Sequence, residues 1–220
     1  MNKRIQISTL LKEQGIMPLF TNPDAELCKF VAKVSYEAGI RVFEFASRTD
    51  NAPEVFTALR KYADEYLPEL IIGVGTIITV KDAQKYLALG AEFIVAPMLS
   101  EEVGKFCREN DIFWCPGAST LSEIVRAHDL GADLVKIFPA ETLGGPAFIK
   151  AIKAPCPWIN VMPTGGVTTA EENLKGWFAT GISCVGIGSN LFSKDILASP
   201  EKTKERVVTL LETIKKVRNA

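Results

Sequence analysis

The sequence is poor in the residues that build metal centres and disulfide frameworks. It contains one histidine, His128, in a polar helical stretch, and five cysteines that form no C-x-x-C pair. A catalytic zinc site needs several such ligands, and no cysteine–histidine spacing in this chain supplies them. An odd number of cysteines, several of them inside apolar runs, argues against paired disulfides. We therefore expect a chemistry that uses no metal.

The chain also lacks an excess of charge and long apolar runs. Its 25 basic and 26 acidic residues give a formal net charge of -1, which indicates neither a nucleic-acid partner nor an acidic membrane surface. No apolar run approaches the roughly 18 residues that a membrane span requires. The charged residues 1–7 lead into no apolar core or cleavage site of a secretory signal. These absences predict a cytoplasmic protein with a small-molecule partner.

What the chain does contain is one pattern repeated eight times, a short apolar run followed by a helical stretch. An amphipathic helix over 3–14 precedes the first repeat. The predicted strands are 16–20, 41–45, 70–75, 93–96, 112–115, 134–138, 158–162 and 184–187. The helices that follow them are 24–38, 52–66, 80–89, 100–109, 120–129, 146–152, 169–179 and 199–218.

Strands that alternate with helices form a parallel sheet. Eight such units, with no linker or inserted domain between them, predict a single α/β domain over residues 1–220. The fold class that we expect is a closed (β/α)8 TIM barrel with an N-terminal helix. The alternative is an open, doubly wound sheet.

One lysine stands inside the sixth predicted strand. Branched and aromatic residues flank Lys136 on both sides, and Pro139 ends the run. Lysine is rarely buried unless it is paired or neutral, because burial disfavours the charged form of an amine. A neutral amine can attack a ketone and form a Schiff base, and Phe138 would help to keep water away from it. Alternatively, the stem of Lys136 is buried and its ammonium group reaches water at the strand end.

Other polar groups lie near the ends of the second and third strands, where a barrel of this kind places its active site. Glu44 stands within an apolar run, where an unpaired carboxylate is costly, so it is either a partner for Lys136 or a proton-transfer group. Alternatively, it forms a buried ion pair with a lysine or an arginine and has no catalytic role. Arg48 could bind a substrate carboxylate through its planar guanidinium, or could lie on the surface. Thr76 could donate a hydrogen bond to the same carboxylate, or could cap a helix.

Glycine-rich turns follow the last two predicted strands. Thr164, Gly165 and Gly166 follow the seventh strand, and Gly188 and Ser189 follow the eighth. Such turns present backbone N–H groups, which together bind phosphate in this fold. The two turns therefore predict a phosphate site, although the same glycines could serve only as tight turns.

In this order, the segments resemble the KDPG/KHG aldolases, that is, the 2-dehydro-3-deoxy-phosphogluconate and 4-hydroxy-2-oxoglutarate aldolases. The similarity runs from about residue 15 to about residue 192. The segments that carry it are 41–44 with 48–49, 73–76, 116–117 with 119–120, 135–141 and 163–166.

The resemblance implies a class I lyase that works as a homotrimer with neither metal nor cofactor. In such an enzyme Lys136 would form the Schiff base and Glu44 would transfer protons. Arg48 and Thr76 would hold the carboxylate of the pyruvate half of the substrate. Beyond that half, Thr164 would bind a substrate hydroxyl, and the phosphate would meet Gly165, Gly166, Gly188 and Ser189.

The expected reaction is cleavage of 2-dehydro-3-deoxy-6-phosphogluconate to pyruvate and glyceraldehyde 3-phosphate. Cleavage of 4-hydroxy-2-oxoglutarate or 2-dehydro-3-deoxy-6-phosphogalactonate is the alternative within the family. A phosphosugar isomerase or epimerase, or a non-catalytic barrel that binds phosphometabolites, is the alternative outside it. Some family members carry an arginine near Ile16 and Met17 that this chain lacks, and segment 45–47 departs from the more usual Val-Thr-Leu. Both departures bear on substrate choice and not on Schiff-base chemistry.

Overall fold

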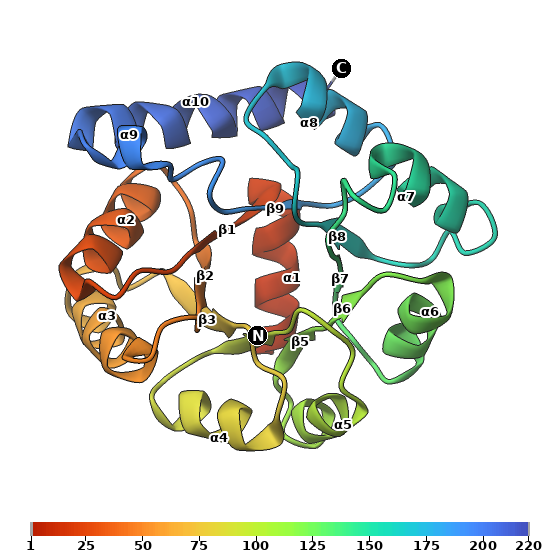
Figure 1. Ribbon diagram of the computed structural model, residues 1–220, viewed down its shortest axis with the longest axis horizontal. Coiled ribbons are helices and arrows are strands. Elements are labelled where there is room, and N and C mark those ends of the chain that lie inside the picture. Colours follow the sequence, from red (N-terminus) through yellow and green to blue (C-terminus); the bar gives the residue numbers. More distant parts are fainter. Residues whose placement is uncertain (1, 220) are drawn as a thin grey trace.

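Parallel strands form a ring in the computed structural model, which describes residues 2–219 (Figure 1). One run of neighbouring strands has the order β5-β4-β3-β2-β1-β9, and a second run has the order β6-β7-β8. The strands are β1 (Ile16–Phe20), β2 (Val42–Ala46), β3 (Ile71–Gly75), β4 (Phe93–Val95), β5 (Phe113–Cys115), β6 (Gly117–Ala118), β7 (Val135–Ile137), β8 (Val161–Pro163) and β9 (Val185–Ile187).

Two joints close the ring. Strands β5 and β6 are two halves of one strand, which is interrupted at Pro116. Both ends of this strand bond to the segment that forms β7, because Asp133 N donates to Trp114 O (3.1 Å) and Lys136 N donates to Pro116 O (2.8 Å). On the other side, a parallel bridge between Thr164 and Gly186 joins β8 to β9. Eight strand positions thus form a closed barrel, as the alternating pattern predicted.

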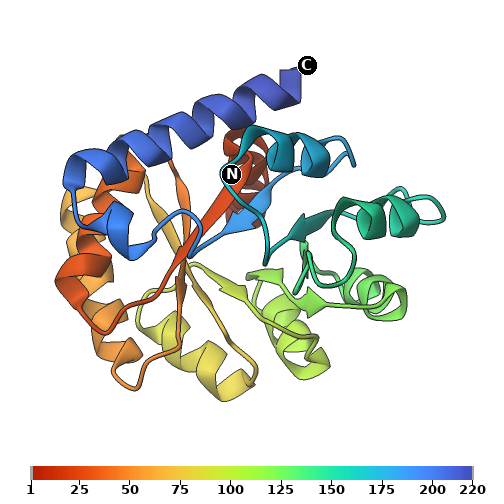
Figure 2. The same cartoon turned by 45° about the horizontal axis from the view of Figure 1, so that its top comes forward.

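Helices cover the outside of this ring (Figures 1 and 2). No helix in the described range 2–219 is both long and apolar enough to cross a membrane. The covering helices are α2 (Ala25–Glu37), α3 (Ala52–Tyr66), α4 (Val80–Ala88), α5 (Glu101–Glu109), α6 (Leu121–Asp129), α7 (Gly145–Lys153), α8 (Glu171–Phe178), α9 (Lys194–Leu197) and α10 (Pro200–Asn219).

Successive strand residues alternate between two apolar clusters. On β2, Val42 belongs to an inner cluster within the barrel, whereas Phe43 and Phe45 belong to the outer cluster beneath the helices. Because both faces of every strand are buried, the strands read as almost continuous apolar runs. The same alternation turns Glu44 inward on β2 and Lys136 inward on β7, since side chains point to opposite faces at every step.

Helix α1 (Lys3–Gln14) closes one end of the barrel, and in Figure 1 it fills the centre of the ring. Asn2 begins the helix, because its side chain accepts a hydrogen bond from Arg4 N (2.8 Å). Ile7 and Leu11 are buried and belong to the inner cluster, together with Met17, Val42, Ile71, Phe93, Val95, Phe113, Cys115, Leu134, Met162 and Cys184. An apolar plug from α1 therefore seals the barrel below the layer that holds Glu44 and Lys136.

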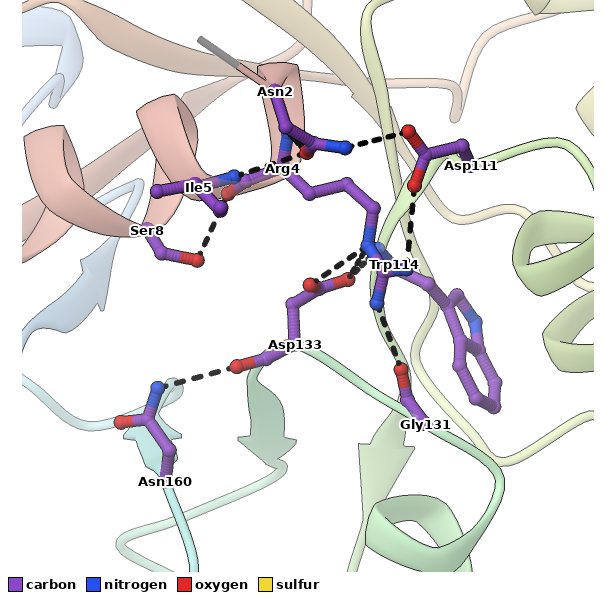
Figure 3. A network of polar contacts seen from close by, with 9 residues as sticks. All are labelled: Asn2, Arg4, Ile5, Ser8, Asp111, Trp114, Gly131, Asp133 and Asn160. Atoms are coloured by element: carbon purple, nitrogen blue, oxygen red, sulfur yellow. Dashed lines mark hydrogen bonds and ion pairs between the residues drawn. The ribbon is translucent and has the colours of Figure 1, made fainter.

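A polar network fixes α1 to the strands (Figure 3). Arg4 Nε donates to both carboxylate oxygens of Asp133, at 3.0 and 3.2 Å, and Arg4 Nη2 donates to Gly131 O at 3.3 Å. Asp133 Oδ2 also accepts from Trp114 N (2.9 Å). Burial raises the pKa of Asp133 above its usual value, while its bonds with Trp114 and Arg4 oppose that rise. Asp133 lies just before β7, so the network anchors the strand that carries Lys136.

Replacing Asp133 by alanine is expected to lower the free energy of unfolding by about 2–4 kcal/mol, because Arg4 and the Trp114 N–H lose a shared acceptor. The two charged side chains are only 17% and 12% exposed. Urea unfolding followed by circular dichroism measures the change. Lys105→Ala is the control, since its ion pair with Glu109 is 75% and 61% exposed and should contribute little. Equal effects of the two substitutions would contradict the anchoring role of Asp133.

Three elements differ from the sequence-based expectation. The strand predicted over 158–162 was wrong at its start, because Trp158 is 58% exposed and a turn closes there, with Ile159 N donating to Cys156 O (3.3 Å). The short strand β6 was missed because Pro116 was taken as the end of the fifth strand. The four-residue helix α9 was also missed, being too short to show a helical period.

Candidate active site

A buried lysine and a buried glutamate meet inside the barrel. Lys136 Nζ lies 3.5 Å from Glu44 Oε1, and the two residues are 3% and 0% exposed. Both carboxylate oxygens are buried and have no hydrogen-bond partner in the described part of the chain. An ion pair this isolated is expensive to bury and adds little net stability, so its presence favours a chemical role.

Two glycines make room for the polar side chains of the interior. A Cβ on Gly75 would fall well inside contact distance of Glu44 Oε1, and a Cβ on Gly186 would do the same to Thr164 Oγ1. Both glycines are buried. Glycine at these two positions leaves Glu44 and Thr164 space that any larger side chain would occupy.

Replacing Gly75 by alanine is expected to lower kcat by about 10–100-fold, because the added methyl group displaces the Glu44 carboxylate from the amine, and small misplacements of a catalytic group are costly. Steady-state kinetics of the cleavage reaction measure the effect. Gly176→Ala is the control, because a Cβ on Gly176 meets its nearest neighbour, Pro146 Cγ, at 3.5 Å. Unchanged kcat in Gly75→Ala would show that the position of Glu44 is not critical.

Arg48 and Thr76 meet at the neighbouring strand ends. Arg48 is exposed, and its Nε donates to Thr76 Oγ1 at 3.3 Å. The Thr76 hydroxyl therefore keeps its own proton available for another acceptor. Thr76 has a φ of 68°, in the left-handed region that β-branched residues rarely adopt. Such local strain is concentrated at functional sites.

A cavity of about 270 Å³ opens at the same end of the barrel. Six of the expected site residues line it: Arg48, Phe138, Thr164, Gly165, Gly188 and Ser189. The other four expected residues do not line it. Lys136 and Glu44 are buried, and Lys136 Nζ lies 5.8 Å from the centre of the Phe138 ring, which lines the cavity. Thr76 bonds to the lining residue Arg48, and Gly166 follows the lining residue Gly165.

The two glycine turns offer unused hydrogen-bond donors. Gly165 and Gly166 have φ values of 89° and 86°, which favour glycine. Within residues 2–219 no backbone acceptor engages the N–H of Gly166 or Ser189, whereas the N–H of Gly165 faces Gly186 in the bridge between β8 and β9. The Thr164 hydroxyl is likewise buried without a partner. These groups could bind an anion or hydroxyl that enters the cavity.

Cys115 shares the interior with the ion pair. Burial raises the pKa of its thiol well above the ordinary value, Lys136 opposes that rise and Glu44 adds to it. The thiol therefore stays protonated at neutral pH and is a poor nucleophile. The five cysteines are free and buried, His128 is exposed, and no group of three metal-ligating side chains occurs among the described residues.

A larger hollow, of about 790 Å³, lies at the opposite end of the barrel beside α1. Its charged side chains are already paired, with Arg60 Nη1 2.9 Å from Glu92 Oε1 and Arg41 Nε 3.2 Å from Glu69 Oε2. The lysine that lines this hollow, Lys3, has a side chain that is 49% exposed, whereas Lys136 is 3% exposed. We therefore place the chemistry at the smaller cavity.

The sequence analysis missed four residues that line the cavity of about 270 Å³: Leu19, Phe20, Thr21 and Phe192. Thr21 Oγ1 is buried without a partner, and the signal that could have found it is its place directly after β1. Met17 is fully buried and belongs to the same inner cluster as Ile7 and Leu11 of α1. The contribution of the first strand to the cavity thus begins at Leu19.

Comparison with known proteins identifies the family of this chain. The family model described as KDPG and KHG aldolase matches residues 7–208. The chain belongs to this family. Members of the family are aldolases, a class of lyase, and this fits a barrel with a buried amine better than an isomerase or a non-catalytic barrel does.

Individual relatives cover most of the chain. The 2-dehydro-3-deoxy-phosphogluconate aldolase of Dickeya dadantii is 34% identical over 90% of each chain. The KHG/KDPG aldolase of Escherichia coli K12 is 32% identical over 89% of each. The crystal structure of the 2-keto-3-deoxy-6-phosphogluconate aldolase of Zymomonas mobilis ZM4 with 3-phosphoglycerate superposes with a TM-score of 0.80, at 26% identity, over 93% of this chain and 94% of that chain.

Proposed function

We propose that this protein is a class I aldolase that cleaves 2-dehydro-3-deoxy-6-phosphogluconate to pyruvate and glyceraldehyde 3-phosphate. The observation that carries the proposal is the buried pair of Lys136 Nζ and Glu44 Oε1, 3.5 Å apart, beside a cavity with anion-binding groups. An amine in this setting has one carboxylate to exchange protons with and little contact with water. Those are the conditions that formation of a Schiff base requires.

The first half of the reaction joins the substrate to Lys136. The amine attacks the C2 ketone and forms a carbinolamine, and loss of water gives a protonated imine. Glu44 moves the protons that these two steps require. The C4 hydroxyl then gives its proton to the Glu44 carboxylate, the C3–C4 bond breaks, and the electron pair of that bond flows into the imine. The aldehyde leaves, and the pyruvate half remains on Lys136 as an enamine.

The second half releases pyruvate. The enamine takes up a proton at C3 and becomes an imine again, and water hydrolyses this imine to pyruvate and the free amine of Lys136. Atoms balance, because the water lost when the imine forms is regained when it is hydrolysed. No metal or cofactor takes part in this scheme.

The remaining site residues bind the two ends of the substrate. Arg48 and the Thr76 hydroxyl hold the carboxylate of the pyruvate half. Phe138 shields the amine from water, and Thr164 binds a hydroxyl of the substrate. The free N–H groups of the two turns hold the phosphate, in keeping with the 3-phosphoglycerate in the Zymomonas mobilis structure.

A substrate panel tests the proposal. Pyruvate release is followed with 2-dehydro-3-deoxy-6-phosphogluconate, its galactonate epimer and 4-hydroxy-2-oxoglutarate, with and without a chelator. We expect the phosphogluconate compound to give the highest kcat/KM and the chelator to have no effect. A preference for 4-hydroxy-2-oxoglutarate would favour the KHG activity in the name of the Escherichia coli relative. A loss of activity with the chelator would contradict the metal-free scheme.

We further propose that the protein acts in the cytoplasm as a homotrimer. The free thiols suit a reducing compartment. Several large apolar side chains are exposed, Met98 at 54% and Trp158 at 58% among them, and subunit contacts could cover them. Sedimentation equilibrium measures the mass of the assembly, and a monomer would contradict this part of the proposal.

A further inference from the structure

We propose that Asn190 is a positioning residue that sets the spacing of the two glycine turns, and thereby determines how strongly the enzyme prefers a phosphorylated aldehyde half. This inference rests on the proposed function, because it assigns the phosphate to these turns. Asn190 is not expected to touch the substrate. It acts through the backbone that it holds.

The two turns meet where the barrel is most weakly joined. Every other pair of neighbouring strands shares two or more register pairs or, for β3 and β4, one register pair and two further backbone bonds. Within the described chain, β8 and β9 are linked by the single bridge between Thr164 and Gly186. Just above it, Asn190 Nδ2 donates to Val167 O at 2.9 Å. This hydrogen bond connects the turn after β9 to the turn after β8 at the end of the barrel where the cavity opens.

Each of the two turns is also held from the helix layer. Arg206 on α10 reaches the same asparagine, with Nη2 3.5 Å from Asn190 O. Arg206 Nε is buried and has no partner among residues 2–219. On the far side, Asn173 Oδ1 of α8 accepts from Thr168 N at 2.8 Å. Asn190 thus joins a turn that α8 holds to a turn that α10 supports.

The spacing of the turns matters because an anion must contact both. The free N–H groups of Gly166 and Ser189 belong to different turns, and the cavity reaches both turns, at Gly165 and at Ser189. Hydrogen bonds weaken steeply as distances and angles depart from their optimum, so a change in the gap weakens both contacts with phosphate at once. Lys136 and Glu44 belong to β7 and β2, which do not depend on Asn190 for their pairing.

The experiment compares condensation of pyruvate with glyceraldehyde 3-phosphate and with glyceraldehyde, two aldehydes that differ only in the phosphate. In Asn190→Ala, the ratio of kcat/KM for the phosphorylated to the unphosphorylated aldehyde is expected to fall about tenfold, as the loss of one or two hydrogen bonds would cause. Asn190→Asp, which cannot donate to Val167 O and adds a negative charge, should lower the ratio further.

Asn110→Ala is the matched control, because Asn110 Nδ2 donates to Phe106 O at 2.8 Å on a helix end far from the cavity. It should leave the ratio unchanged. A purely structural role for Asn190 would lower both rates equally and leave the ratio as in the wild type. That result, or no change at all, would overturn the inference.

A second measurement separates this inference from the proposed function. Calorimetric titration with 3-phosphoglycerate needs no turnover, and Asn190→Ala should bind it about tenfold more weakly than the wild type, by the same loss of hydrogen bonds. If pyruvate labels Lys136 while both variants bind 3-phosphoglycerate as the wild type does, the inference fails and the proposed function stands. If pyruvate labels no lysine, the proposed function fails, and the titration still decides whether Asn190 shapes an anion site.

Discussion

Replacing Lys136 by methionine is expected to abolish cleavage, with kcat falling about a million-fold or more, toward the uncatalysed rate. Methionine nearly matches the volume of the lysine stem and removes the amine, so no covalent intermediate can form. The loss should be in kcat, since the groups that bind the carboxylate and the phosphate remain. Pyruvate release in a coupled assay at saturating substrate measures it.

Two controls accompany this substitution. Lys150→Met changes an exposed lysine on α7 and should keep full activity. Circular dichroism checks that Lys136→Met is folded, because removing one partner of a buried ion pair costs about 3–5 kcal/mol of stability. A folded Lys136→Met protein that retains a few per cent of wild-type kcat would exclude Lys136 as the Schiff-base residue. Such a rate would lie far above the uncatalysed rate that is expected without the amine.

Replacing Glu44 by glutamine is expected to lower kcat by about 10²–10⁴-fold, the usual cost of losing a positioned proton-transfer group. Glutamine keeps the shape of the side chain and cannot exchange a proton. The Schiff base should still form, only more slowly, which distinguishes this variant from Lys136→Met. Pre-steady-state kinetics of imine formation and overall kcat measure the two effects separately.

Glu141→Gln serves as the control, because Glu141 is an exposed acidic residue shortly after β7, the strand that carries Lys136. Its kcat should match the wild type. If Glu44→Gln lowered kcat less than about tenfold, proton transfer by Glu44 would not be needed, and the carboxylate would act only as the partner of a buried ammonium group.

Much of the architecture could be predicted because the strands carry a strong local signal. All eight strand positions are short apolar runs bounded by proline, glycine or polar residues, and eight repeats allow one closed barrel. Lys136 and Glu44 drew attention for the same reason, since each is a charged residue within such a run. Here the fold turns both inward and brings them together.

Features that depend on tertiary contact could not be predicted. Trp158 is apolar and lies in an apolar stretch, yet it is exposed, so the seventh strand was placed too early. The bond from Arg48 to Thr76 and the unpaired hydroxyl of Thr21 depend on which strand ends adjoin. The hydrogen bond from Asn190 to Val167 depends on how β8 and β9 adjoin, and no local sequence pattern predicts that.

The most direct test of the account is to trap the covalent intermediate. The protein is incubated with pyruvate and borohydride, digested, and analysed by mass spectrometry. Reduction of the imine should add one pyruvate-derived group to the peptide that contains Lys136, and the adduct should be missing in Lys136→Met. An adduct on Lys150 or Lys153, or none on any lysine, would contradict the assignment of the Schiff base to Lys136.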